Sequence, residues 1–207
     1  MYEKDYLENI VRKFDRIPPQ KKQIIQAASI MADAVLSGGK VYIYDREKAL
    51  MVEANTRASG LAITSNYYDR NKKLTPKDVL ILAAVEPDTP GDVEIARKVK
   101  GEGAKVIAIV SKMGASRKPL AEEGDVIIDN HSPESMGILS VQGQLQKREF
   151  CPTTGVMNDI IFWAVCAAFI DEMFARGKTP SVYSGVHVSG GMELYKRATE
   201  RCEKLGY

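Results

Sequence analysis

Two continuous apolar runs constrain the fold of this chain more than any other feature of its sequence. They cover residues 78–85 (DVLILAAV) and 105–110 (KVIAIV), and the segment between them, residues 90–101, repeats its apolar residues at helical spacing. A strand that is apolar on both faces has to be covered on both sides, as happens when a parallel sheet lies between two layers of helices. The pattern therefore predicts an α/β protein built around a parallel sheet.

The rest of the chain continues this alternation. Further strands are predicted at residues 40–44, 61–64 and 125–129, and helices at about 20–36, 47–59, 153–176 and 192–205, with Tyr6, Ile10 and Phe14 marking a helix before them. We expect a flavodoxin-like parallel sheet with helices on both faces and extra helices at both termini. Residues 1–207 are expected to form a single domain, with an N-terminal helical extension over about residues 1–36. Residues 132–150 carry no clear pattern.

Charge and cysteine usage exclude several classes of function. The 29 basic and 27 acidic residues are mixed along the chain and leave a net charge of +2, so neither a nucleic acid nor a membrane surface is an expected partner. The apolar run at 160–170 is shorter than the roughly 20 residues that a membrane span needs. Cys151, Cys166 and Cys202 form no close pairs, which argues against disulfides and zinc. A cytoplasmic protein without metal or cofactor is expected, since no nucleotide-binding glycine motif is present either.

Ligands of open parallel sheets bind at the carboxyl ends of the strands. The loop at residues 86–91 follows the most apolar strand and opens a helix, and helix N-termini attract anions. This loop nevertheless carries Glu86 and Asp88. These acids can compensate the helix dipole, accept hydrogen bonds from a ligand hydroxyl or ammonium group, or bind a metal. Thr153 and Thr154 likewise either cap the long apolar helix or supply hydroxyls to a pocket.

Seven segments, taken in order, resemble a known family. They are GGKVYIY (38–44), ALMVEANTRASGLA (49–62), the block at 78–112, GDVIIDN (124–130), CPTTGVMNDIIF (151–162), ARGKTPSVYSG (175–185) and HVSGG (187–191). Together they look like the sugar isomerase (SIS) phosphosugar-binding domain over about residues 27–202. The last three segments are similar to a poorly characterised bacterial subfamily of SIS domain proteins. No single motif is diagnostic, but the order and spacing are specific.

The resemblance implies binding, and a possible aldose–ketose isomerisation, of a sugar phosphate or related sugar derivative. Glu53 falls where phosphoheptose isomerases carry a helix glutamate that acts as general base, although it could simply pair with Arg57. The partner histidine of those enzymes falls close to Asn158, which leaves His131 and His187 as candidates for the acid. The expected substrate-binding residues are Arg46, Glu86, Asp88, Thr89, Thr153, Thr154 and Asn158.

One loop departs from the SIS pattern. The serine-rich phosphate loop of the family falls on residues 84–89, where Thr89 is the one hydroxyl left, so the phosphate loop is degenerate. A catalytically silent sugar-sensing module and a structural oligomeric module are therefore the alternatives. SIS domains also resemble one another in pairing, and the helix at 160–174 is apolar nearly all round. We expect a homodimer or homotetramer that uses this helix and the N-terminal helices.

Overall fold

The computed structural model describes residues 1–69, 71–112, 119–132, 137–142 and 147–207. Its centre is a sheet of five parallel strands in the order β2-β1-β3-β4-β5. The strands are β1 (Val41–Asp45), β2 (Thr64–Asn66), β3 (Val79–Ala83), β4 (Lys105–Ile109) and β5 (Val126–Ile128). The flavodoxin-like parallel sheet expected from the apolar runs is confirmed.

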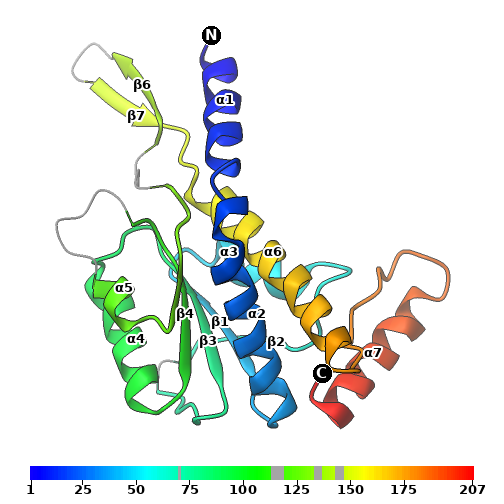
Figure 1. Ribbon diagram of the computed structural model, residues 1–207. Helices are drawn as coiled ribbons and strands as arrows, with labels where there is room; N and C mark the ends of the chain where they lie inside the picture. The colour runs from blue at the N-terminus through cyan, green and yellow to red at the C-terminus, as the bar shows by residue number, and fades with distance from the viewer. Residues whose placement is uncertain (70, 113–118, 133–136, 143–146) are drawn as a thin grey trace.

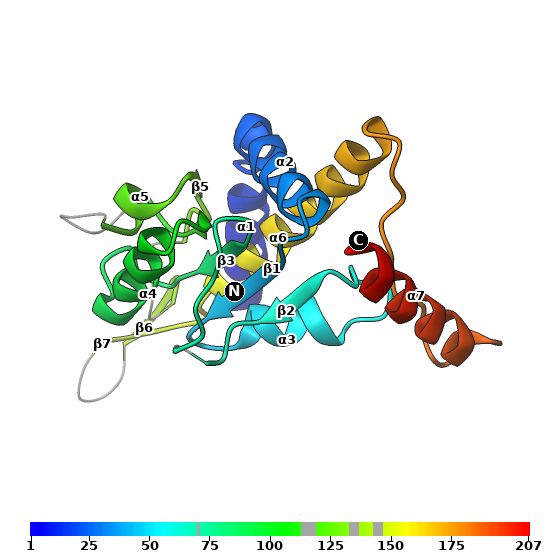
Figure 2. The same ribbon diagram turned by 90° about the horizontal axis from the view of Figure 1, so that it is seen from below.

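Helices cover both faces of the sheet (Figures 1 and 2). The helices are α1 (Tyr2–Phe14), α2 (Lys21–Leu36), α3 (Ala49–Thr56), α4 (Pro90–Gly101), α5 (Pro119–Glu123), α6 (Thr154–Ala175) and α7 (Gly191–Leu205), with a 3-10 turn at Pro18–Gln20. Side chains alternate between the faces along each strand. Ile43 and Ile81 pack in one core with α2, α3 and α6, whereas Tyr42 and Leu80 pack in a second core with α4 and α5.

The second strand lies later in the chain than its apolar residues predicted. The prediction of a strand at 61–64 is wrong: Leu61 makes an isolated antiparallel bridge with Val182, and the strand itself is β2. β2 is an edge strand that pairs with β1 alone and is only partly buried, so its sequence can be the polar TSN. Leu61 and Ile63 are buried in the core, but in the turn that leads into the strand.

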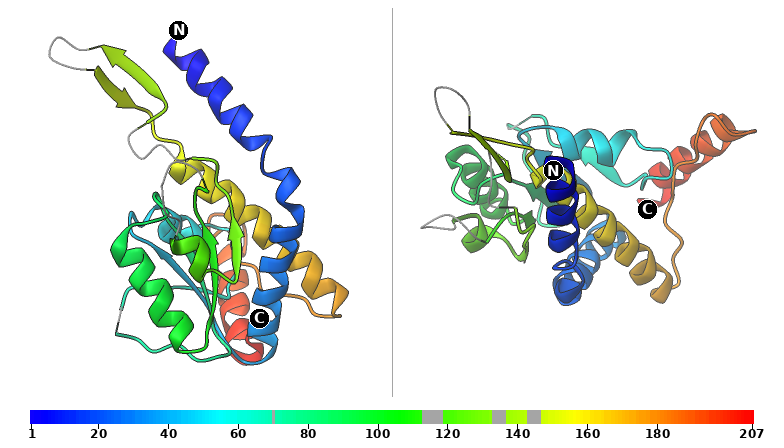
Figure 3. Two further views of the ribbon diagram at one scale, coloured as in Figure 1. Left: turned by 60° about the vertical axis from the view of Figure 1, so that its left-hand side comes forward. Right: turned by 90° about the horizontal axis from the view of Figure 1, so that it is seen from above.

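The described part of residues 132–150, left unassigned from sequence, forms an antiparallel hairpin of β6 (Leu139–Gln142) and β7 (Lys147–Phe150). The hairpin lies beside α1, where the rings of Tyr2 and Phe150 meet edge to face with centroids 5.5 Å apart. Both elements project from the end of the molecule at which α6 begins (Figures 1 and 3). The single-domain organisation over residues 1–207 stays a prediction.

The long apolar helix α6 is a core element. Of the helices that the structure describes, it is the one long and apolar enough to cross a membrane. It packs along α2, and Met157, Ile161, Phe162 and Val165 are all but inaccessible to solvent. Burial between α2, α3 and the sheet thus accounts for these apolar residues of α6.

Candidate ligand-binding site

A cavity of about 490 Å³ lies at the carboxyl ends of β1 and β3, beside the N-terminus of α6. Its walls come from the loops after both strands, from the start of α4 and from α6. The lining residues are Asp45, Arg46, Glu47, Ala83, Val85, Glu86, Thr89, Asp92, Pro152, Thr154 and Gly155. The chain runs from β1 to β2 on one side and returns to β3 on the other. Loops diverge at such a reversal of strand order, which is where ligands of this architecture bind.

Asp45 fixes the loop that follows β1. Its Oδ1 accepts the backbone N–H of Glu47 at 3.0 Å, and its Oδ2 accepts the N–H of Leu50 at 2.9 Å. Lys48, between them, adopts a left-handed conformation with φ 63°. Asp45 is 5% exposed, and this burial raises the pKa of its carboxyl group even though the two backbone hydrogen bonds oppose the shift. Asp45 therefore anchors the start of α3 from inside the cavity.

Arg46 lies across the start of α4 and binds Asp92. Its Nη2 and Nε lie 2.8 Å and 3.1 Å from Asp92 Oδ1, and the hydroxyl of Tyr44 donates to the same oxygen at 3.4 Å. Asp92 is 2% exposed. The guanidinium passes directly over Gly91, where an added Cβ would lie 2.6 Å from Nη2. The absence of a side chain at this position is what lets Arg46 reach Asp92.

The two threonines at the start of α6 have different surroundings. Thr153 is fully buried, and its hydroxyl lies 2.9 Å from the hydroxyl of Ser132. Asn158 accepts a hydrogen bond from Asn130 at 2.8 Å, so Thr153 and Asn158 both hold the turn after β5. Thr154 lines the cavity at 4% exposure, and its Oγ1 has no hydrogen-bond partner within the described chain. Thr153 is therefore part of the turn after β5, whereas Thr154 belongs to the lining of the cavity.

Glu53 lies on α3 but does not line this cavity. Its Oε2 accepts from Arg57 Nε at 2.5 Å, and its Oε1 accepts from Trp163 Nε1 at 3.3 Å. The helical pair with Arg57 that the sequence allowed is thus present. A general base needs a free carboxylate near the reacting carbon, whereas this carboxylate is held by two neighbours.

Asp159, which the sequence analysis did not single out, lies on the face of α6 that meets α3. Its half-buried carboxyl has a buried Oδ1 with no hydrogen-bond partner among the described residues. Burial raises the pKa of Asp159 to about 6, and the negative charges of Glu53 and Asp45 add to the effect. The sequence does contain a signal for this residue, because Asp159 is an acid within the most apolar helix of the chain.

The two histidines lie apart from this cavity. His131 is held by Asp129, with Nδ1 3.4 Å from the carboxylate, and its Nε2 lies 3.3 Å from Gln20 Nε2. His187 lines a separate hollow of about 270 Å³ together with Arg57. Among the described residues, neither makes a hydrogen bond or ion pair with Glu53, whose partners are Arg57 and Trp163.

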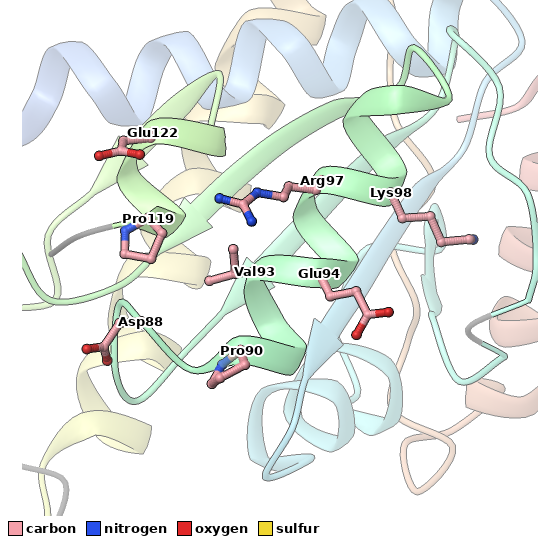
Figure 4. A pocket seen from close by; sticks show the side chains of 8 residues that line it. All are labelled: Asp88, Pro90, Val93, Glu94, Arg97, Lys98, Pro119 and Glu122. Atoms are coloured by element: carbon pink, nitrogen blue, oxygen red, sulfur yellow. The ribbon is translucent and has the colours of Figure 1, made fainter.

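Asp88 lies outside the cavity as well. It borders an open groove of about 690 Å³ between α4 and α5, whose lining side chains are Asp88, Pro90, Val93, Glu94, Arg97, Lys98, Pro119 and Glu122 (Figure 4). The cavity thus brings together four of the expected site residues, namely Arg46, Glu86, Thr89 and Thr154. Glu53, Asp88, Thr153, Asn158 and the two histidines are placed elsewhere.

Comparison with known proteins gives the family. A family model described as a domain of unknown function (DUF2529) matches residues 10–174. The chain belongs to the DUF2529 family. A relative, the UPF0309 protein lmo0025 of Listeria monocytogenes, is 26% identical over 201 residues, covering 84% of this chain and 85% of the relative. UPF0309 protein TTE0306 of Caldanaerobacter subterraneus is 24% identical and covers 96% of both chains.

Solved structures with the same fold include a sugar isomerase domain and phosphosugar isomerases. A candidate phosphosugar isomerase involved in capsule formation from Bacteroides fragilis superposes with a TM-score of 0.61 at 20% identity, over 95% of both chains. Phosphoheptose isomerase GmhA from Neisseria gonorrhoeae gives a TM-score of 0.57 at 12% identity, covering 81% of this chain and 95% of the enzyme. The DUF2529 chain therefore has the SIS fold that its sequence resembled.

Asp159 makes the stability of the protein depend on pH. Because the pKa of Asp159 is about 6 in the fold against an ordinary value of 3.8, the folded state holds its proton more tightly than the unfolded state. This contribution is complete below about pH 4 and is lost as the pH rises through 6. We expect Asp159→Asn to raise the free energy of unfolding at about pH 8 by about 1–2 kcal/mol, and to change it little at about pH 4.

Urea denaturation at both pH values measures this difference. Asp171→Asn is the matched control, since Asp171 is exposed on the same helix and should give no pH-dependent change. An Asp159→Asn variant with the same stability difference from wild type at pH 4 and pH 8 would contradict the assignment.

Proposed function

We propose that this DUF2529 protein binds a monosaccharide or monosaccharide derivative in the cavity between β1, β3 and α6. The observation that carries the proposal is Thr154, which lines the cavity and whose buried hydroxyl has no partner in the described chain. A buried polar group without a partner is costly, and a ligand hydroxyl removes that cost. The first-turn amides of α6 add donors at the same wall.

Size and fold support the same ligand class. A volume of about 490 Å³ lies within the range of small-molecule sites. Among the proteins of similar fold, the Vibrio vulnificus NanR protein was solved in complex with ManNAc-6P; it superposes with a TM-score of 0.58 at 9% identity, over 99% of this chain and 68% of NanR. GmhA is named a phosphoheptose isomerase. Sugar derivatives are thus ligands that this architecture accommodates.

The binding proposal is tested with variants that leave the charges unchanged. An added Cβ at Gly155 meets nothing within 4 Å, so Gly155→Leu extends a side chain into the open space of the cavity. We expect it to weaken sugar binding at least about tenfold, and Thr154→Val to weaken it by a similar factor through the lost hydroxyl. Isothermal titration against a panel of hexoses and their derivatives measures both.

Gly101→Leu is the matched control, because position 101 also faces open space but lies at the far end of α4. Equal affinity of wild type and Gly155→Leu for every sugar bound would contradict binding in this cavity.

Isomerisation is the second candidate function. It is favoured by the carboxyl groups of Glu53 on α3 and Asp159 on α6, which are close enough for the charge of Glu53 to raise the pKa of Asp159. Proton transfer between adjacent carbons of a sugar needs one group to accept a proton and another to donate it. The contacts of Glu53 with Arg57 and Trp163 favour the silent, sensing alternative instead.

Hydrogen exchange separates the two alternatives. An isomerase incorporates solvent deuterium at C2 of its sugar, which proton NMR detects, and Glu53→Gln should slow that incorporation at least about 100-fold. Glu94→Gln, an exposed acid on α4, is the control. Absence of incorporation for every sugar that binds would rule out isomerisation and leave a sugar-binding module.

We further propose that the protein is a cytoplasmic homodimer or homotetramer that pairs partly through α1. Leu7, Val11 and Phe14 repeat at helical spacing on α1 and are 61%, 58% and 49% exposed. α1 projects from the rest of the molecule (Figure 3), and about half or more of each of these side chains is left uncovered by the described part of the chain. A second copy of the chain, offering the same stripe, would bury it from both sides.

Light scattering at micromolar concentration tests the pairing. The double substitution Leu7→Glu and Val11→Glu places two charges in the stripe and should shift the mass toward the 22.9 kDa of one chain. Arg12→Glu, exposed on the same helix, should leave the mass unchanged. A wild-type mass of 22.9 kDa would contradict the proposal.

A further inference from the structure

The proposed sugar cavity has an unusual charge. Its described lining contains the carboxylates Asp45, Glu47, Glu86 and Asp92 against a single cation, Arg46. That cation is already engaged, because both its Nε and Nη2 donate to Asp92. An incoming ligand therefore meets carboxylates that the cavity itself does not neutralise.

The four acids fall into two kinds. Asp45 and Asp92 are buried and act within the fold. The first holds the loop before α3 through the backbone amides of Glu47 and Leu50, and the second holds Arg46 and Tyr44. Glu47 and Glu86 have exposed side chains that make no hydrogen bond or ion pair with any residue in the described ranges. Glu47 and Glu86 are thus the carboxylates available to a ligand.

The opposite wall is different. α6 has no acid in its first turn, and it contributes to the lining Gly155 and Thr154, whose buried hydroxyl has no partner in the described chain. Such a helix start is suited to the lone pairs of sugar hydroxyl oxygens. The cavity is therefore divided into a donor wall on α6 and an acceptor wall on the loops after β1 and β3.

A phosphate group does not fit this division. A dianion next to Glu86 is repelled by it, and neither Lys48 nor Lys112 lines the cavity. A metal ion is not favoured either, since the described residues contain no cluster of three His, Cys, Asp or Glu side chains that could hold one. An organic ammonium group needs only hydrogen-bond acceptors, which two free carboxylates supply.

We infer that the preferred ligand is an amino sugar without a phosphate group, with its ammonium between Glu47 and Glu86 and its hydroxyls at Thr154. The inference rests on the proposed sugar binding in this cavity and names the class of sugar. It differs from a phosphosugar site in the sign of the charge that is recognised.

Isothermal titration with three matched ligands tests the inference. These are a hexose, its 2-amino-2-deoxy derivative and its 6-phosphate, each in the gluco, galacto and manno configurations, at about pH 6.5 and low ionic strength. We expect the amine to bind at least about tenfold more tightly than the neutral hexose and the phosphate in one configuration. The double variant Glu47→Gln and Glu86→Gln should reduce this advantage to about twofold or less, whereas Glu94→Gln, on α4 in the separate groove of Figure 4, should preserve it.

The outcomes separate the two proposals. Tightest binding of the phosphate, or an amine advantage that survives in the double variant, overturns the inference and leaves sugar binding in place. Failure of all nine ligands to bind overturns the proposed function and the inference with it. An amine advantage that is lost in the double variant and in Gly155→Leu supports both.

Discussion

The burial of three parallel strands on both faces of the sheet is the constraint on which the rest of this structure depends. Residues of β1, β3 and β4 are almost all inaccessible to solvent on both faces of the sheet. A sheet buried in this way needs a helix layer on each face, and each helix has to return the chain to the same edge before the next strand begins. The loops after β1 and β3 and the start of α6 are brought to one edge by this requirement, and the cavity lies between them.

The same constraint explains which parts of the fold could be predicted. Buried strands need continuous apolar residues, and such runs predicted β1, β3, β4 and β5. The helix α4 was predicted with its observed bounds, Pro90–Gly101. The edge strand β2 was predicted a few residues too early, because Leu61 and Ile63 are buried in the core but lie in the turn before the strand. The hairpin of β6 and β7 left no such signal, since it packs beside α1 rather than on the sheet.

Only part of the candidate site could be predicted from the sequence, and the reason is different. Sequence position identified the loops, and Arg46, Glu86, Thr89 and Thr154 do meet in the cavity. The ion pair of Arg46 and Asp92 joins residues that lie far apart in the sequence. The sequence alone therefore could not show that the Arg46 guanidinium is already paired. The different roles of Thr153 and Thr154 depend on which hydroxyl reaches Ser132, and helix geometry alone does not decide that.

A substitution at Gly91 could change the charge of the cavity during evolution. A side chain at position 91 would collide with the guanidinium of Arg46 and push it away from Asp92. The released cation, 39% exposed even when paired, would then be free to turn into the cavity beside Glu86. One added methyl group, at a position that does not itself line the cavity, could thus change an acidic cavity into one that tolerates anions. Relatives with and without glycine at this position would then diverge in ligand class while keeping every lining residue.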